Sequence, residues 1–162
     1  MTWQRDKRWS DLFIPEITPI LGQYLIGPAP EEDDALRNSD LMVLKMDSVR
    51  IGCRIRRHCN IDLYGEEFTI RMSRPSENKT EFTKIIEGWG DYFFYGFSDK
   101  QESSLERYHL CDLKVFRLAV MRMLVCGKNP WNIMHNHDGS STFAVFKWSD
   151  FPDNFILTKY PL

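Results

Sequence analysis

Two stretches near the middle of the chain alternate between apolar and polar residues, a pattern typical of a β-strand with one buried face. The first covers residues 49–57 and the second covers residues 67–72. Each stretch therefore predicts a strand. In the first, Val49, Ile51, Cys53 and Ile55 alternate with Arg50, Gly52, Arg54 and Arg56; in the second, Phe68, Ile70 and Met72 alternate with Glu67, Thr69 and Arg71.

Other apolar patterns predict the remaining elements. Apolar residues at helical spacing predict a helix over residues 9–26, interrupted near Pro19. Thr80 and Asp112 are suited to begin two further helices, the second running to Cys126. The segment 91–97 is nearly all aromatic and is expected to be a buried central strand. Shorter apolar runs predict strands at residues 41–46, 108–111 and 143–147.

These elements indicate an α/β fold. We expect a mixed central sheet of about five strands with helices on its faces. The chain has 162 residues, enough for one domain with its own core, so we expect a single domain over residues 1–162. Within it, a core spans roughly residues 10–115 and a C-terminal extension covers roughly residues 116–162.

Cysteine usage and charge distribution refine this expectation. The four cysteines, at positions 53, 59, 111 and 126, form no C-x-x-C pair, which favours buried free thiols in a reducing cytoplasm. No export signal or membrane-spanning run is visible. The net charge of −2 conceals a division, because residues 1–48 hold nine acids against five bases, whereas residues 49–74 hold six arginines against three acids. The second region predicts a local basic patch.

The order of the predicted elements over roughly residues 10–115 is helix, three strands, helix, strand and strand, with Asp40 before the first strand. This order resembles the PD-(D/E)XK nuclease superfamily, particularly archaeal-type Holliday-junction resolvases. The resemblance covers about two-thirds of the chain and implies a restriction-endonuclease-like αβββαββα core. It also implies a Mg²⁺-dependent DNA endonuclease, in which carboxylates hold the ion and a lysine stabilises developing charge. Relatives of this kind act as dimers, so the resemblance implies a possible homodimer.

The resemblance breaks down at the E-x-K motif, which falls on Arg54-Ile55-Arg56. A guanidinium group repels a cation, so Arg54 cannot be a metal ligand. A remodelled site would use Asp40 and Glu67 as metal ligands, with Glu16 (or Asp11) as the helix acid and Lys84 (or Lys79) as the catalytic lysine. The alternatives are a capping role for Asp40 and a cross-strand partnership of Glu67 with Arg54 or Arg56.

Arginines supply the candidate nucleic-acid contacts. Guanidinium groups bind phosphates in a bidentate manner, so a stripe of them could follow a DNA backbone without reading its sequence. The alternative is a solvated strand face whose arginines pair with Glu66, Glu67 and the acidic residues 31–34. The candidate residues are Arg50, Arg54, Arg56, Arg71 and Arg74.

Two functions therefore remain open. The first is a metal-dependent DNA endonuclease with a remodelled active site. The second is a catalytically inactive protein of the same fold, such as a phage or mobile-element accessory protein, that binds DNA or a protein partner. Histidines and cysteines at positions 58–59, 109–111 and 135–137 do not have the spacing of a zinc site. The aromatic residues from Trp89 to Phe97 are expected to form core.

Overall fold

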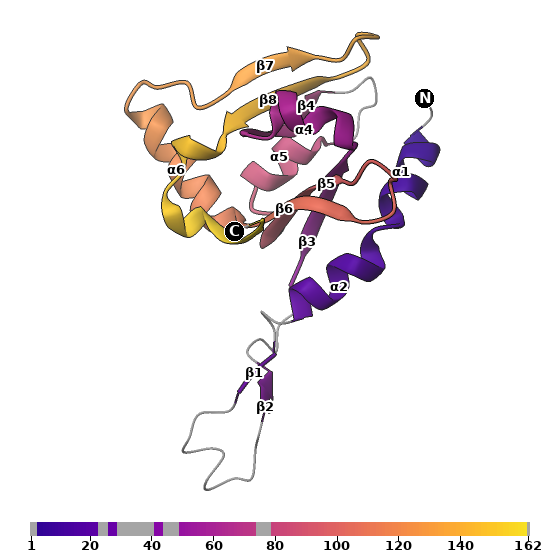
Figure 1. The fold of residues 1–162 in the computed structure, drawn as a ribbon. Helices are drawn as coiled ribbons and strands as arrows, with labels where there is room; N and C mark the ends of the chain where they lie inside the picture. Colours follow the sequence, from indigo (N-terminus) through magenta and orange to yellow (C-terminus); the bar gives the residue numbers. More distant parts are fainter. Residues whose placement is uncertain (1–2, 23–25, 29–40, 44–48, 74–78, 162) are drawn as a thin grey trace, which may run out of the picture.

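The computed structural model describes residues 3–22, 26–28, 41–43, 49–73 and 79–161 (Figure 1). It is a mixed α/β structure whose main sheet contains both parallel and antiparallel pairs. This four-stranded sheet has the order β3-β5-β6-β9. Its strands are β3 (Ile51–Arg56), β5 (Tyr92–Ser98), β6 (Leu105–Asp112) and β9 (Ile156–Tyr160).

A second, three-stranded sheet has the order β4-β8-β7. The strand predicted at residues 67–72 is present as β4, but it pairs with β8 instead of joining the main sheet. The central sheet is thus smaller than the predicted one. The strands of the second sheet are β4 (Glu67–Ser73), β8 (Thr142–Lys147) and β7 (Asn132–His135), and a separate antiparallel pair is formed by β1 (Ile26–Pro28) and β2 (Leu41–Val43).

Two short N-terminal helices cover one face of the main sheet (Figure 1). They are α1 (Trp3–Asp11) and α2 (Ile14–Gly22), where a helix over residues 9–26 with an interruption near Pro19 was predicted. Pro19 lies inside α2. The break precedes Pro15, which is well suited to a first helical turn because it has no backbone N–H. Phe13 and Ile17 are buried against Phe94 and Leu110 of the sheet.

The opposite face of the main sheet carries the larger core, which is rich in aromatic rings. Phe93, Tyr95 and Phe97 of β5 pack there against Phe68 of β4 and Phe116 of α6 (Leu113–Val125). The segment 91–97 is therefore the central buried strand that its sequence predicted. The remaining elements are the short helices α4 (Ile61–Tyr64) and α5 (Glu81–Ile86) and the 3-10 turns η1 (His58–Asn60), η2 (Trp148–Asp150) and η3 (Asp153–Phe155).

The predicted helix starts are present, whereas the predicted burial of the cysteines is wrong for three of the four. Thr80 and Asp112 cap α5 and α6 as predicted. All four cysteines are free thiols, but only Cys111 is buried, whereas the other three are exposed. None of the helices in the described ranges is long and apolar enough to cross a membrane.

Asp112→Ala should destabilise the protein by about 1 kcal/mol. The Asp112 carboxylate accepts hydrogen bonds from the backbone N–H groups of Lys114 (2.7 Å) and Val115 (3.1 Å). Alanine leaves these first-turn donors without their side-chain acceptor. Urea denaturation measures the loss, and Asp112→Asn, which keeps a capping oxygen, is the matched control. Equal stability of wild type and Asp112→Ala would show that the cap contributes nothing.

Candidate functional site

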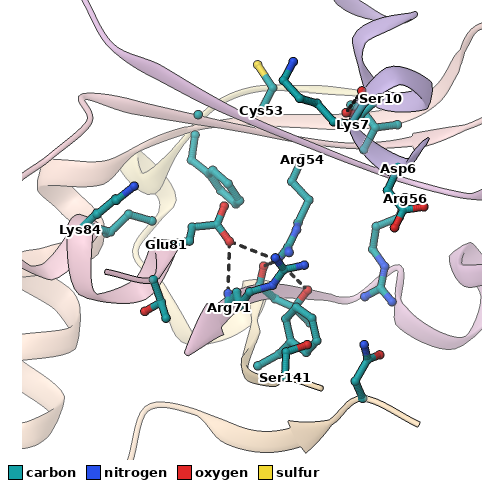
Figure 2. Close-up of a pocket in the computed structure, with 18 of the residues that line it drawn as sticks. Asp6, Lys7, Ser10, Cys53, Arg54, Arg56, Arg71, Glu81, Lys84 and Ser141 are labelled. Atoms are coloured by element: carbon teal, nitrogen blue, oxygen red, sulfur yellow. Dashed lines mark hydrogen bonds and ion pairs between the residues drawn. The ribbon is translucent and has the colours of Figure 1, made fainter. Parts of the chain in front are cut away.

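A groove of about 1090 Å³ opens between β3, the edge strand of the main sheet, and the three-stranded sheet (Figure 2). Helix α1 contributes Lys7 to its lining, and α5 contributes Glu81 and Lys84. The turn between β7 and β8 contributes Asn136 and Ser140. Residues distant in the sequence thus meet around one concave surface, the geometry of a binding site.

The lining of this groove is positively charged. Seven lysine and arginine residues line it, against three carboxylate residues. The whole chain has a net charge of −2, so the groove differs in sign from the protein as a whole. Four of the seven cations are paired with carboxylates: Lys7 with Asp11, Arg54 with Glu81, Arg57 with Glu102 and Lys79 with Glu87. The remaining excess of cations in a cleft attracts anions. The cationic residues are Lys7, Arg54, Arg56, Arg57, Arg71, Lys79 and Lys84, and the acidic ones are Asp6, Glu81 and Asp138.

Arg54 is held in place inside the groove by contacts with two other elements (Figure 2). Its Nη1 atom donates to the carbonyl oxygen of Thr69 (2.8 Å) and lies 3.3 Å from Oε2 of Glu81. The same Glu81 oxygen accepts a hydrogen bond from the backbone N–H of Arg71 (3.1 Å). These contacts join β3, β4 and α5. Only 18% of the Arg54 side chain is exposed, so most of the guanidinium's surroundings exclude solvent.

Phe143 forms an apolar surface under two of the arginines. The guanidinium carbon of Arg54 lies 5.2 Å from its ring centroid and that of Arg71 lies 5.5 Å away. Cations above an aromatic face are attracted by the negative face of the ring. The ring therefore helps to hold two positive charges close together, which favours the binding of an anion between or beside them.

Helix α1 contacts Arg57, which lies directly after β3, at the side of the groove. The Arg57 guanidinium lies 4.5 Å from the Trp9 ring centroid and pairs with Glu102, and Trp9 Nε1 donates to Glu102 Oε2 (2.7 Å). The hydrogen bond from Arg57 lowers the pKa of Glu102. On the opposite side of the groove, hydrogen bonds from Ser140 lower the pKa of Asp138.

Of the predicted metal and catalytic residues that the structure describes, Glu16, Glu67 and Lys84, only Lys84 lines this groove. Asp40 lies outside the described residues. Both carboxylate oxygens of Glu16 accept a hydrogen bond from the backbone N–H of Leu105 (3.1 and 3.0 Å). Glu67 is paired in register with Lys147 and does not line the groove. Lys84 does line it.

The predicted arginine stripe is divided among several environments. Arg54, Arg56 and Arg71 line the groove, and Arg56 also lies 5.0 Å from the Tyr64 ring centroid. Arg50 is exposed and lies outside the groove lining, and Arg74 is outside the described residues. Arg54 and Arg56 point to the face of the main sheet that carries the larger core, because they lie in register with Tyr95 and Phe97.

No donor set for a divalent cation is found within the described ranges, where no group of three or more histidine, cysteine, aspartate or glutamate side chains could hold a metal ion. Glu81, the carboxylate at the centre of Figure 2, is occupied by the Arg54 guanidinium. The described side chains of the groove therefore do not fit Mg²⁺, since a guanidinium beside the ion would repel it.

Three groove residues were not singled out from the sequence. Glu81 follows the capping residue Thr80, so its pattern predicted only a helix start. Phe143 begins the strand predicted at residues 143–147, and nothing in that pattern indicates that its ring faces arginines. Lys7 lies in a charged N-terminal segment whose pattern predicted no element. Asp6 and Lys7 belong to α1, and only the packing of this helix brings them to the groove.

Comparison of the chain with protein-family models, with curated proteins and with solved structures found no match. The groove is therefore the feature from which a function can be inferred. Its three informative properties are its positive charge, the positioning of Arg54 by Glu81, and the aromatic rings beside its arginines.

Proposed function

We propose that this protein binds nucleic acid through its phosphate backbone, using the groove between β3 and the three-stranded sheet. The observation that supports the proposal most strongly is the excess of lysine and arginine over carboxylate in the groove of a chain with net negative charge. Phosphate contacts by arginine and lysine provide most of the affinity of sequence-independent nucleic-acid binding.

The arrangement favours a polymer of phosphates over a single small anion. The cations come from α1, β3, β4 and α5, so they surround an extended surface and do not converge on one point. The carboxylate of Glu81 restrains Arg54 and leaves the groove with a net positive charge. A chain of phosphates can neutralise several of these cations at once, whereas one phosphate cannot.

Under this proposal the protein is a binding protein, the second of the two functions that the sequence leaves open. The endonuclease of restriction-endonuclease-like fold would need metal ligands beyond the described groove residues, with Asp40 as the first candidate. Cleavage of the bound nucleic acid in the presence of Mg²⁺ or Mn²⁺ is the observation that would favour the endonuclease.

Lys84→Gln should weaken nucleic-acid binding several-fold and reduce its dependence on salt. Lys84 is exposed at the groove, so its removal subtracts a phosphate contact without disturbing the core. One lost contact lowers the slope of log K against log salt by about 0.7–0.9. Fluorescence anisotropy with labelled single-stranded and duplex oligonucleotides, over a range of salt concentrations, measures both effects.

The matched control is Lys128→Gln, which removes the same charge from an exposed lysine outside the groove lining. Its salt slope should equal that of the wild type. Lys84→Glu should weaken binding more than Lys84→Gln, because it adds a repulsive charge. If neither oligonucleotide binds the wild-type protein at low salt, or if the two glutamine variants behave alike, the groove is not a nucleic-acid interface.

A further inference from the structure

Trp89 differs from the aromatic residues that follow it. Phe93, Phe94 and Phe97 are fully or almost fully buried, whereas 58% of Trp89 is exposed. Trp89 also lines the groove, as does Lys84. An exposed indole beside a row of cations is the combination that binds single-stranded nucleic acids, in which bases stack on aromatic rings while phosphates contact basic side chains.

The backbone of Trp89 is fixed by the end of helix α5. Gly88 has a φ of +95°, and its N–H donates to the carbonyl of Ile85 (3.1 Å). The N–H of Trp89 donates to the carbonyl of Lys84 (2.9 Å), which completes a Schellman motif. The indole is therefore presented by a rigid turn, so little backbone freedom would be lost when a ligand binds.

A second set of bonds ties this turn to the start of β3. The N–H of Arg50 donates to the Asp91 carboxylate (2.8 Å), and the N–H of Asp91 donates to the carbonyl of Arg50 (2.8 Å). The Arg50 guanidinium carbon lies 5.6 Å from the Trp89 ring centroid. Arg50, which is outside the groove lining itself, thus lies over one face of the indole.

The groove has room for a short segment of one strand. Its volume of about 1090 Å³ lies just above the range of ordinary small-molecule pockets, about 300–1,000 Å³. A segment of a few nucleotides fits such a space. Bases in a duplex are also stacked on one another, so their faces are not available to Trp89.

We infer that the groove binds a single strand of nucleic acid, with one base stacked on the face of Trp89 that Arg50 does not cover. The phosphates of the same strand contact Arg54, Arg71 and Lys84. This inference rests on the proposed nucleic-acid binding and specifies the form of nucleic acid. Stacking tolerates every base, so the protein should bind with little sequence preference.

Trp89→Ala and Trp89→Phe provide the test, with binding to labelled single-stranded and hairpin-duplex oligonucleotides followed by anisotropy. The wild type should bind the single strand more tightly than the duplex. Trp89→Ala should weaken single-strand binding roughly 5- to 150-fold, the effect expected for one lost base stack. Trp89→Phe should retain most of the affinity, since it keeps an aromatic face. Quenching of indole fluorescence on binding should disappear in large part in Trp89→Phe.

Tyr160→Ala is the matched control, because Tyr160 is similarly exposed (52%) and lies outside the groove lining. Its single-strand affinity should equal that of the wild type, and the melting temperatures of all variants confirm their folding. If the duplex binds as tightly as the single strand and Trp89→Ala binds both normally, the inference is overturned while the proposed function stands. If the wild type binds neither, both are overturned.

Discussion

Phe68→Ala should destabilise the protein by about 3–5 kcal/mol, the usual cost of removing a buried phenyl ring. Phe68 is fully buried on β4, and its ring centroid lies 4.4 Å from that of Trp148 and 5.1 Å from that of Phe146. Four further aromatic rings have centroids within 6.4 Å. Alanine leaves a cavity among rigid rings, which cannot close it without leaving their own contacts.

The loss is measurable by urea denaturation and as a fall in melting temperature of roughly 10 °C. Leu63→Ala is the control: Leu63 is 74% exposed, so its truncation should change stability by no more than about 0.5 kcal/mol. A Phe68→Ala protein within about 1 kcal/mol of the wild type would mean that the two sheets are not joined through this aromatic cluster. Thr69 and Arg71 flank the cluster on β4, so the variant should also bind nucleic acid less well.

The strands β3, β4 and β5 were predicted correctly because their signal is local. Alternation or continuous apolar character within a few residues reports which faces of a strand are buried. The sheet that a strand joins is not a local property. Glu67 of β4 is in register with Lys147, and no pattern within residues 67–72 specifies that distant partner. This is why one central sheet was predicted where the structure has a four-stranded and a three-stranded sheet.

Two of the elements missed by the sequence, β7 and β9, are short edge strands with little buried surface. In β7 three of the four residues are exposed, and β9 has no fully buried residue. Both strands are defined by backbone hydrogen bonding to a neighbour and not by side-chain burial, so no hydrophobic period marks them. Trp89 was assigned to core because it precedes an aromatic strand, but two glycines with positive φ, Gly88 and Gly90, flank it outside that strand.

The candidate site was predictable only in part. Alternation along residues 49–57 placed Arg54 and Arg56 on one face, and the structure has them on one face. The same pattern favours a solvated surface, yet Arg54 lies between elements and is paired with Glu81. The sequence does not distinguish an arginine on a solvated strand face from one that is held in a groove. The carboxylate that holds Arg54, that of Glu81, lies on a helix 27 positions later. Tertiary packing supplies this information.

Acidification should destabilise the protein through His109 by about 3 kcal/mol between neutral pH and pH 4. His109 of β6 is 8% exposed and stacks on Trp148, with ring centroids 4.2 Å apart. Its Nδ1 has no hydrogen-bond partner among the described residues. Burial lowers the pKa of His109 to about 4, and the charges of Arg107 and Lys159 act in the same direction.

The direction of this change in stability follows from the number of protons that each state binds. The unfolded chain takes up a proton at this histidine near pH 6.5, whereas the folded protein keeps it neutral down to about pH 4. The unfolded state therefore binds more protons in this window, so stability falls as the pH is lowered through it and the contribution of His109 levels off below it. Burial, which excludes water from the ring, is the main physical cause.

His109→Phe isolates this contribution because phenylalanine retains the ring beside Trp148 and cannot be protonated. Urea denaturation of both proteins at pH 7 and pH 4 gives two differences in stability. The loss on acidification should be smaller in the variant by about 3 kcal/mol, since the carboxylates that also titrate in this range are common to both proteins. His137→Phe, at an exposed position, should follow the wild type. Parallel pH profiles for wild type and His109→Phe would mean that His109 is accessible to protons in the folded state, and therefore that β6 and η2 are not packed as tightly as their ring contacts require.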